Sequence, residues 1–141
     1  MKWYLKVLKQ YLDFSGRARR KEYWMFLLGH FAFICATLFL IILSSETFSD
    51  STEIDTPSML LIFILSVYLL GTSIPFLAVT VRRLHDTGKS GWWYLICILP
   101  FIGRFVILIF TCIDSEIKPN QWGANPKGIG NDGLIDQIGK E

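Results

Sequence analysis

Three long apolar stretches dominate this sequence and restrict the folds that it can adopt. They cover residues 23–43, 59–81 and 92–113. A bilayer core about 30 Å thick is crossed by about 20 apolar residues of helix, so each stretch is long enough to cross a membrane once. Helices of a soluble bundle would carry polar faces, whereas few polar residues interrupt the first stretch. The sequence therefore predicts an all-α integral membrane protein with three transmembrane helices.

Composition and stretch length support the same class. Charged residues make up 18% of the chain, against about 25% in ordinary soluble domains. The first stretch is longer than the roughly 7 to 15 apolar residues of a cleaved signal peptide, so we expect it to remain in the mature protein. We expect one membrane domain over residues 1–127 and a flexible polar tail over residues 128–141. The three cysteines fall inside the predicted spans, where they favour apolar packing over disulfides.

The distribution of lysine and arginine predicts the orientation. Basic residues are frequent before residue 23, whereas the loop 44–58 has acidic residues and no lysine or arginine. The positive-inside rule then places the N-terminus in the cytoplasm. Three complete spans would leave the C-terminal tail outside. If the third stretch were instead a kinked or re-entrant hairpin, bent at Pro100 and Gly103, the tail would be cytoplasmic.

The first residues have the pattern of a basic amphipathic helix. Apolar side chains recur at helical spacing on one face and lysines occupy the other: Tyr4, Val7, Leu8, Tyr11 and Leu12 against Lys2, Lys6 and Lys9. Such a helix either lies on the membrane surface or packs on the rest of the protein, and both arrangements bury the same face. Ser15 and Gly16 then interrupt the pattern.

The polar stretch RRLHDTGKSGWW, residues 82–93, contains a GKS tripeptide that suggests a phosphate-binding loop. That motif needs a glycine where this chain has Arg83, and a preceding strand where this chain has a membrane helix, so we exclude nucleotide binding. His85 and Asp86 could act as a proton-transfer pair, but the sequence supplies no nucleophile or second carboxylate at a defined spacing. We expect no enzymatic activity.

An interface role explains more of this stretch. Residues 86–88 have the composition of a turn, Ser90 suits the N-cap of the next helix, and Trp92 and Trp93 are residues that favour the headgroup level. We therefore interpret the stretch as a cytoplasmic loop between two apolar segments.

Three motifs resemble a known family. They are FSGRARRKEYW at residues 14–24, RRLHDTGKSGWW at residues 82–93 and NQWGANP at residues 120–126. In this order they are similar to the bacterial small inner-membrane proteins of the domain of unknown function 805 family, the YhaH/YhaI type, over about residues 3–127. The resemblance implies a small inner-membrane protein and brings no established activity, substrate or catalytic residue. Trp122 and Arg104 depart from the residues that are usual in the family.

We expect a non-enzymatic membrane protein that binds anionic lipid or a membrane-protein partner, with neither cofactor nor metal and without nucleic acid. At about 1 kcal/mol per basic residue near an anionic surface, a cluster of cations can add several kcal/mol of attraction. The alternative is an oligomeric transporter or channel that uses hydroxyl groups of the second span. Arg104 lies deep in the third stretch and either snorkels outward or faces an interior anion or lipid-headgroup site. The candidate binding residues are Arg17, Arg19, Arg20, Lys21, Arg82, Arg83, Lys89 and Arg104.

Overall fold

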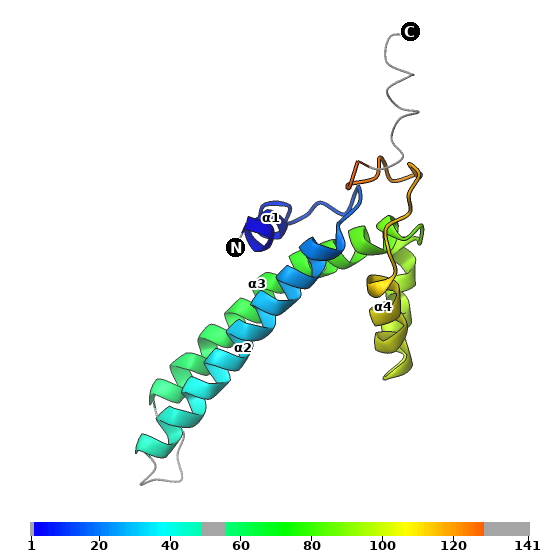
Figure 1. The fold of residues 1–141 in the computed structure, drawn as a ribbon. Helices are drawn as coiled ribbons and strands as arrows, with labels where there is room; N and C mark the ends of the chain where they lie inside the picture. The colour runs from blue at the N-terminus through cyan, green and yellow to red at the C-terminus, as the bar shows by residue number, and fades with distance from the viewer. Residues whose placement is uncertain (1, 49–55, 129–141) are drawn as a thin grey trace.

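The computed structural model describes residues 2–48 and 56–128. Within these ranges the chain folds into helices and connecting turns (Figure 1). In chain order they are α1 (Lys2–Lys9), α2 (Arg20–Phe48), α3 (Thr56–Asp86), the 3₁₀ helix η1 (Gly91–Ile98) and α4 (Ile102–Cys112). Residues 49–55 of the predicted acidic loop, and the predicted flexible tail beyond Gly128, lie outside the described residues.

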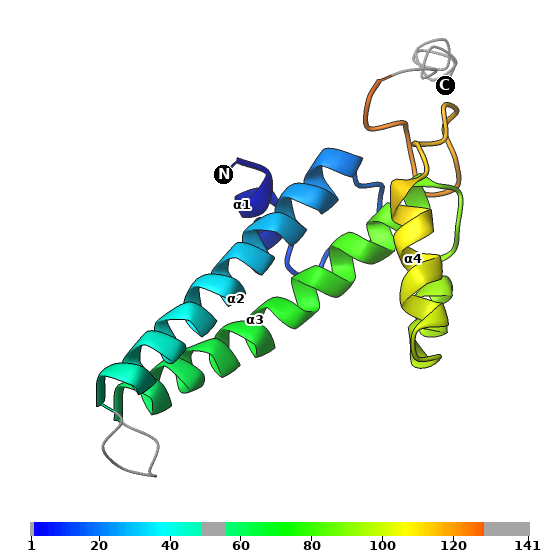
Figure 2. The ribbon, with the colours of Figure 1, turned by 60° about the horizontal axis from the view of Figure 1, so that its bottom comes forward.

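Helices α2 and α3 form a long antiparallel pair, which contains the first two predicted spans (Figures 1 and 2). Both are long and apolar enough to cross a membrane. Along most of their length the large apolar side chains are exposed, among them Phe31, Phe39, Phe63 and Leu70. An apolar surface this extensive is unusual on a soluble monomer and is typical of helices that face lipid.

The buried core lies where α2 begins and α3 ends. Val7 of α1 is fully buried there with Ala18, Phe26 and Val79. Tyr4 stacks on Phe26 with ring centroids 5.1 Å apart. The amphipathic N-terminal helix is therefore present, and its apolar face packs on α2 and α3.

The third apolar stretch is not a single helix, because η1 and α4 stand in place of the predicted third span. The chain descends through η1, turns at residues 99–101 and returns through α4, so that the two short helices lie side by side (Figure 1). Eight residues of 3₁₀ helix and eleven of α-helix each span roughly 16 Å, about half of a bilayer core. This is the hairpin alternative, bent at the proline.

Local chemistry explains the bend. Pro100 has no backbone N–H, so it cannot continue the hydrogen-bond ladder of η1, and Leu99 closes that helix by donating to Ile96 O over 3.0 Å. Phe101 then takes a positive φ of 64° at the apex. Gly103 lies directly against η1, where an added Cβ would overlap the carbonyl of Ile96. The smallest residue is required for the two arms to approach this closely.

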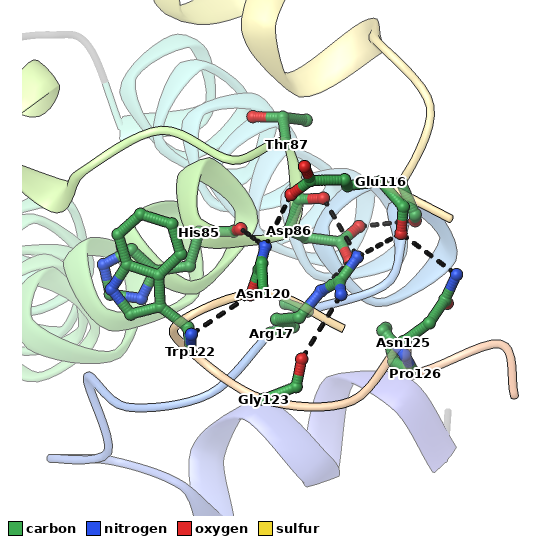
Figure 3. A network of polar contacts seen from close by, with 12 residues as sticks. Arg17, His85, Asp86, Thr87, Glu116, Asn120, Trp122, Gly123, Asn125 and Pro126 are labelled. Atoms are coloured by element: carbon green, nitrogen blue, oxygen red, sulfur yellow. Dashed lines mark hydrogen bonds and ion pairs between the residues drawn. The ribbon is translucent and has the colours of Figure 1, made fainter. Parts of the chain in front are cut away.

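The hairpin returns the chain to the end of the bundle from which it left. Residues 114–128 consequently lie beside the N-terminal segment and the end of α3, as the hydrogen bonds in Figure 3 show. Three complete spans would have placed this segment at the opposite end of the α2–α3 pair.

Candidate functional site

A buried polar cluster joins the N-terminal segment, the end of α3 and residues 114–128 (Figure 3). Arg17 is at its centre, with a side chain only 1% exposed. Its Nε donates to Asp86 Oδ1 over 2.9 Å. Its terminal nitrogens donate to main-chain carbonyls, including Lys118 O at 3.0 Å and Glu116 O at 2.5 Å. One guanidinium therefore ties three segments together.

Asp86 is the anion of this cluster and is completely buried. Besides Arg17, its carboxylate accepts hydrogen bonds from the guanidinium of Arg83 and from the hydroxyl of Ser115, the latter over 2.5 Å. Arg83, also fully buried, donates further to main-chain carbonyls, among them Thr111 O at 3.1 Å. Buried charges need this kind of pairing, because a charge without partners in a protein interior is strongly destabilising.

A second ion pair lies beneath α1. Glu22, 1% exposed, accepts from Lys6 Nζ over 2.7 Å and lies 3.5 Å from a terminal nitrogen of Arg82. The same nitrogen of Arg82 donates to the side chain of Gln10. The pairs fix α1 against the ends of α2 and α3.

Residues 114–128 fold over the end of α3 through a set of specific contacts. Asn120 donates to His85 O and to the Glu116 carboxylate, both over 2.9 Å. The ring of Trp122 stacks on His85 with centroids 4.5 Å apart (Figure 3). Asn125 donates to the carbonyls of Glu116 and Ile117. The NQWGANP motif is thus the part of the chain that covers this end of the bundle.

His85 and Asp86 have separate hydrogen-bond partners. His85 Nδ1 lies 3.3 Å from Gly16 O and its ring contacts Trp122, whereas the Asp86 carboxylate is held by Arg17, Arg83 and Ser115. Within residues 2–48 and 56–128 no three His, Cys, Asp or Glu side chains gather to hold a metal ion. What the arrangement offers chemically is a hydrogen-bonded ion-pair cluster in which two arginines share one carboxylate.

The loop before η1 has the predicted local structure. The turn after α3 contains Gly88 with a positive φ of 73°, which favours glycine. Ser90 caps η1 by accepting from Trp92 N over 3.4 Å. Trp92 is largely exposed, as an interfacial anchor would be.

The structure divides the predicted cationic residues into two groups. Arg17, Arg82 and Arg83 are buried and each is paired with a carboxylate, while Nε and one terminal nitrogen of Arg82 have no hydrogen-bond partner in the described part of the chain. The others lie at least partly at the surface: Arg19 donates to Pro126 O, Arg20 to the carbonyls of Cys112 and Ile113, Lys21 is exposed, and Lys89 lies over the rings of Trp93 and Phe110.

Arg104 is also exposed, but it lies apart from the other surface cations. It lines a cavity of about 450 Å³ between the α2–α3 pair and the hairpin, together with aromatic, aliphatic and hydroxyl side chains. The buried cluster and this cavity are the two places where the fold brings predicted site residues into a defined environment.

Sequence reasoning did not identify the acidic and amide residues of the site. Glu22, Asn120 and Asn125 each bind groups distant in sequence. The signal available for them was their presence in the first and third family-like motifs. Asp86 was singled out as a proton-transfer residue, but its arginine partners were not foreseen.

Comparisons with known proteins agree with the fold and the motifs. A family model described as "Protein of unknown function (DUF805)" matches residues 11–124. The chain is 46% identical over 127 residues to inner membrane protein YhaI of Escherichia coli (strain K12), an alignment covering 90% of this chain and 97% of that protein. It is 41% identical over 129 residues to inner membrane protein YhaH of the same strain, covering 90% of this chain and 98% of YhaH.

A more distant relative is the uncharacterised protein YiiR of the same strain, 30% identical over 143 residues, covering 86% of this chain and 88% of YiiR. No solved structure matches the chain. The matched region includes α2, α3, the hairpin and the polar cluster, and the two nearer relatives are inner-membrane proteins. This chain is a small inner-membrane protein that belongs to the DUF805 family.

Proposed function

We propose that this protein is a non-enzymatic, two-span protein whose cytoplasmic end binds anionic lipid. In this arrangement α2 and α3 cross the membrane, the N-terminus and residues 114–128 are cytoplasmic, and the η1–α4 hairpin dips into the cytoplasmic leaflet. The positive-inside rule supports the orientation, because basic residues precede α2 and follow α3.

The observation that carries the proposal is the position of cations at both ends of the apolar hairpin. Lys89 lies two residues before η1, and its Nζ lies 5.9 Å from the centroid of the Trp93 ring. Arg20 binds the last carbonyls of α4, and Lys21 is exposed beside it. The tip is strongly apolar, with Phe101 88% exposed. A hairpin inserted in one leaflet would bring these three cations to headgroup level.

Because Arg17, Arg82 and Arg83 are buried, lipid binding has to be tested at the other predicted cations. Neutralising Arg82 or Arg83 would disrupt the fold, so the informative change is the pair Lys21→Gln and Lys89→Gln. The protein would be reconstituted in nanodiscs of phosphatidylglycerol and phosphatidylethanolamine, and the lipids that remain after mild delipidation would be counted by native mass spectrometry. Lys118→Gln, on the exposed segment after α4, is the matched control.

We expect the double variant to retain less phosphatidylglycerol, with phosphatidylethanolamine unchanged, and the difference to shrink at high salt because the attraction is screened. The control should retain the wild-type amounts. Equal loss of both lipids from the double variant would contradict the proposal. A specific protein that copurifies from native membranes in place of anionic lipid would instead favour the partner-binding alternative.

An oligomeric transporter or channel is the alternative, and it has less support. The hydroxyls of Ser66, Thr72, Ser73 and Thr80 all donate to carbonyls of α3 itself. These hydrogen bonds engage the hydroxyl protons within α3, so the hydroxyls offer only acceptor lone pairs to a polar path. The same native mass spectra would detect a defined ring of subunits.

A further inference from the structure

The cavity beside the hairpin has an amphiphilic lining. Trp24 and Leu27 of α2, Phe76 of α3 and Leu108 of α4 supply apolar walls. Arg104 supplies a charge, and further polar groups come from hydroxyl-bearing side chains. These are Tyr23, Thr80, Tyr94 and Thr111. Its volume of about 450 Å³ falls within the roughly 300 to 1,000 Å³ typical of ligand sites.

Arg104 lies well below the cationic end of the hairpin. It lies eight positions before Cys112, whose carbonyl accepts from Arg20. At about 1.5 Å per residue, this places Arg104 roughly 12 Å farther toward the tip. If the hairpin lies in the leaflet as proposed above, the backbone of Arg104 lies at the depth of the acyl chains.

The charge of Arg104 has no counterpart in the described part of the chain. Among residues 2–48 and 56–128 it forms neither an ion pair nor a hydrogen bond, and the cavity lining contains no carboxylate. Arg17, Arg82 and Arg83, in contrast, are each held by a carboxylate. An arginine at membrane depth is costly unless an anion or water compensates it. The lining residues supply no carboxylate for this charge, and the walls suit a hydrocarbon chain.

We propose that this cavity binds one anionic phospholipid of the cytoplasmic leaflet, whose phosphate meets the guanidinium of Arg104 as this side chain reaches up toward the headgroups, and whose acyl chain extends past Leu27 and Phe76. The site rests on the membrane placement of the hairpin proposed above, and it is distinct from the headgroup contacts of Lys21 and Lys89. The bound lipid would fill the space between the hairpin and the two spans, so it would also fix the hairpin in place.

The first test removes the charge. In the nanodisc experiment described above, the wild type should keep a last phosphatidylglycerol molecule through delipidation that strips the others. Arg104→Leu should reduce the occupancy of this molecule at least tenfold. Arg104→Lys should keep part of it, because lysine retains the charge but not the paired donors of a guanidinium. Wild-type occupancy in Arg104→Leu would overturn the proposal.

The second test fills the cavity and leaves Arg104 in place. Leu108→Trp should displace the retained lipid, whereas Ile109→Trp, the same kind of change at the next exposed residue and outside the cavity lining, should not. Equal retention in these two variants would also overturn the site. Loss of the last lipid from Lys21→Gln/Lys89→Gln, together with its persistence in Arg104→Leu, would place the lipid at the hairpin ends instead. If only the proposed lipid binding by Lys21 and Lys89 is wrong, the Arg104 variants should still retain less of the last lipid than the wild type does.

Discussion

Arg17 and Asp86 are 69 residues apart in the sequence, and the Nε atom of Arg17 donates to Asp86 Oδ1 over 2.9 Å. Their side chains are 1% and 0% exposed. Arg83 shares the same carboxylate, so two buried cations depend on one anion, and main-chain carbonyls complete their hydrogen bonding. Several of the carbonyls that accept from Arg17 belong to residues 114–128. The arginine therefore helps to hold this segment in place.

Replacement of the shared anion should be strongly destabilising. We expect Asp86→Asn to lower the free energy of unfolding by about 3 to 5 kcal/mol, the usual cost of leaving buried charges without their partner. The measurement is unfolding in mixed micelles with increasing dodecyl sulfate. Asp114→Asn removes a carboxylate that is 63% exposed, so this control should lower the free energy of unfolding far less than Asp86→Asn does. Similar losses in the two variants would show that Asp86 does not support the cluster.

The two long helices were predictable from the sequence because their evidence is local. An apolar run of about 20 residues specifies a spanning helix without reference to the rest of the chain. The turn at Gly88 and the cap at Ser90 follow from local rules of the same kind. The third run has the same composition, and its folding depends on Pro100 and on the absence of a side chain at Gly103. The sequence indicated a possible bend there, but it did not exclude a kinked helix that still crosses.

The pairing of the cations was not predictable, because it depends on distant residues. Counting charges places Arg17, Arg82 and Arg83 together with Lys21 and Lys89 at one membrane face. Nothing in the local sequence distinguishes an arginine that is buried against a distant carboxylate from a lysine that remains in water. The same limit applies to α1, whose amphipathic pattern fits both a membrane surface and a protein surface. Contacts of Val7 and Tyr4 with α2 decide between them.

The close contact between the hairpin arms predicts that alanine is destabilising at Gly103. At Gly71 of α3, where there is space, the same substitution should be stabilising. Gly103→Ala should destabilise the protein by about 1 to 3 kcal/mol or more, because the added methyl group overlaps the Ile96 carbonyl. Gly71→Ala has open space around the new Cβ, and alanine in a helix is favoured over glycine by about 0.5 to 1 kcal/mol. Unfolding free energies measured in the same micelles should therefore decrease for the first variant and increase for the second. A neutral Gly103→Ala would show that the arms are farther apart.

Asp114 should titrate at unusually low pH. A hydrogen bond from Lys127 Nζ is the main cause that lowers the pKa of this carboxyl from 3.8 to about 2, and the N–H of Ser115 contributes next. Because the folded pKa is depressed, the contact favours the folded state above pH 3.8, and this contribution is lost as the pH falls toward 2. Lys127→Met should raise the pKa toward 3.8 in a carboxyl NMR titration. Lys118→Met, which removes a cation from the same segment, should leave it low, and an unchanged pKa in Lys127→Met would exclude the contact.

The hairpin and a third complete span place the segment after α4 on opposite sides of the membrane. The hairpin places it in the cytoplasm, and three spans place it outside. In a variant whose native cysteines are replaced, we expect Ser51→Cys to react with an impermeant thiol reagent applied from outside, because the sequence places the acidic loop there. Lys118→Cys should react only after permeabilisation, as should Thr87→Cys, since residues 114–128 bind the same end of the bundle as Arg17. Phe101→Cys, at the exposed apolar apex, should react slowly in both conditions because it would lie among acyl chains. A third complete span predicts the opposite result for Lys118→Cys, which would label from outside in intact cells. That single outcome would separate the folded-back hairpin from a membrane-crossing helix.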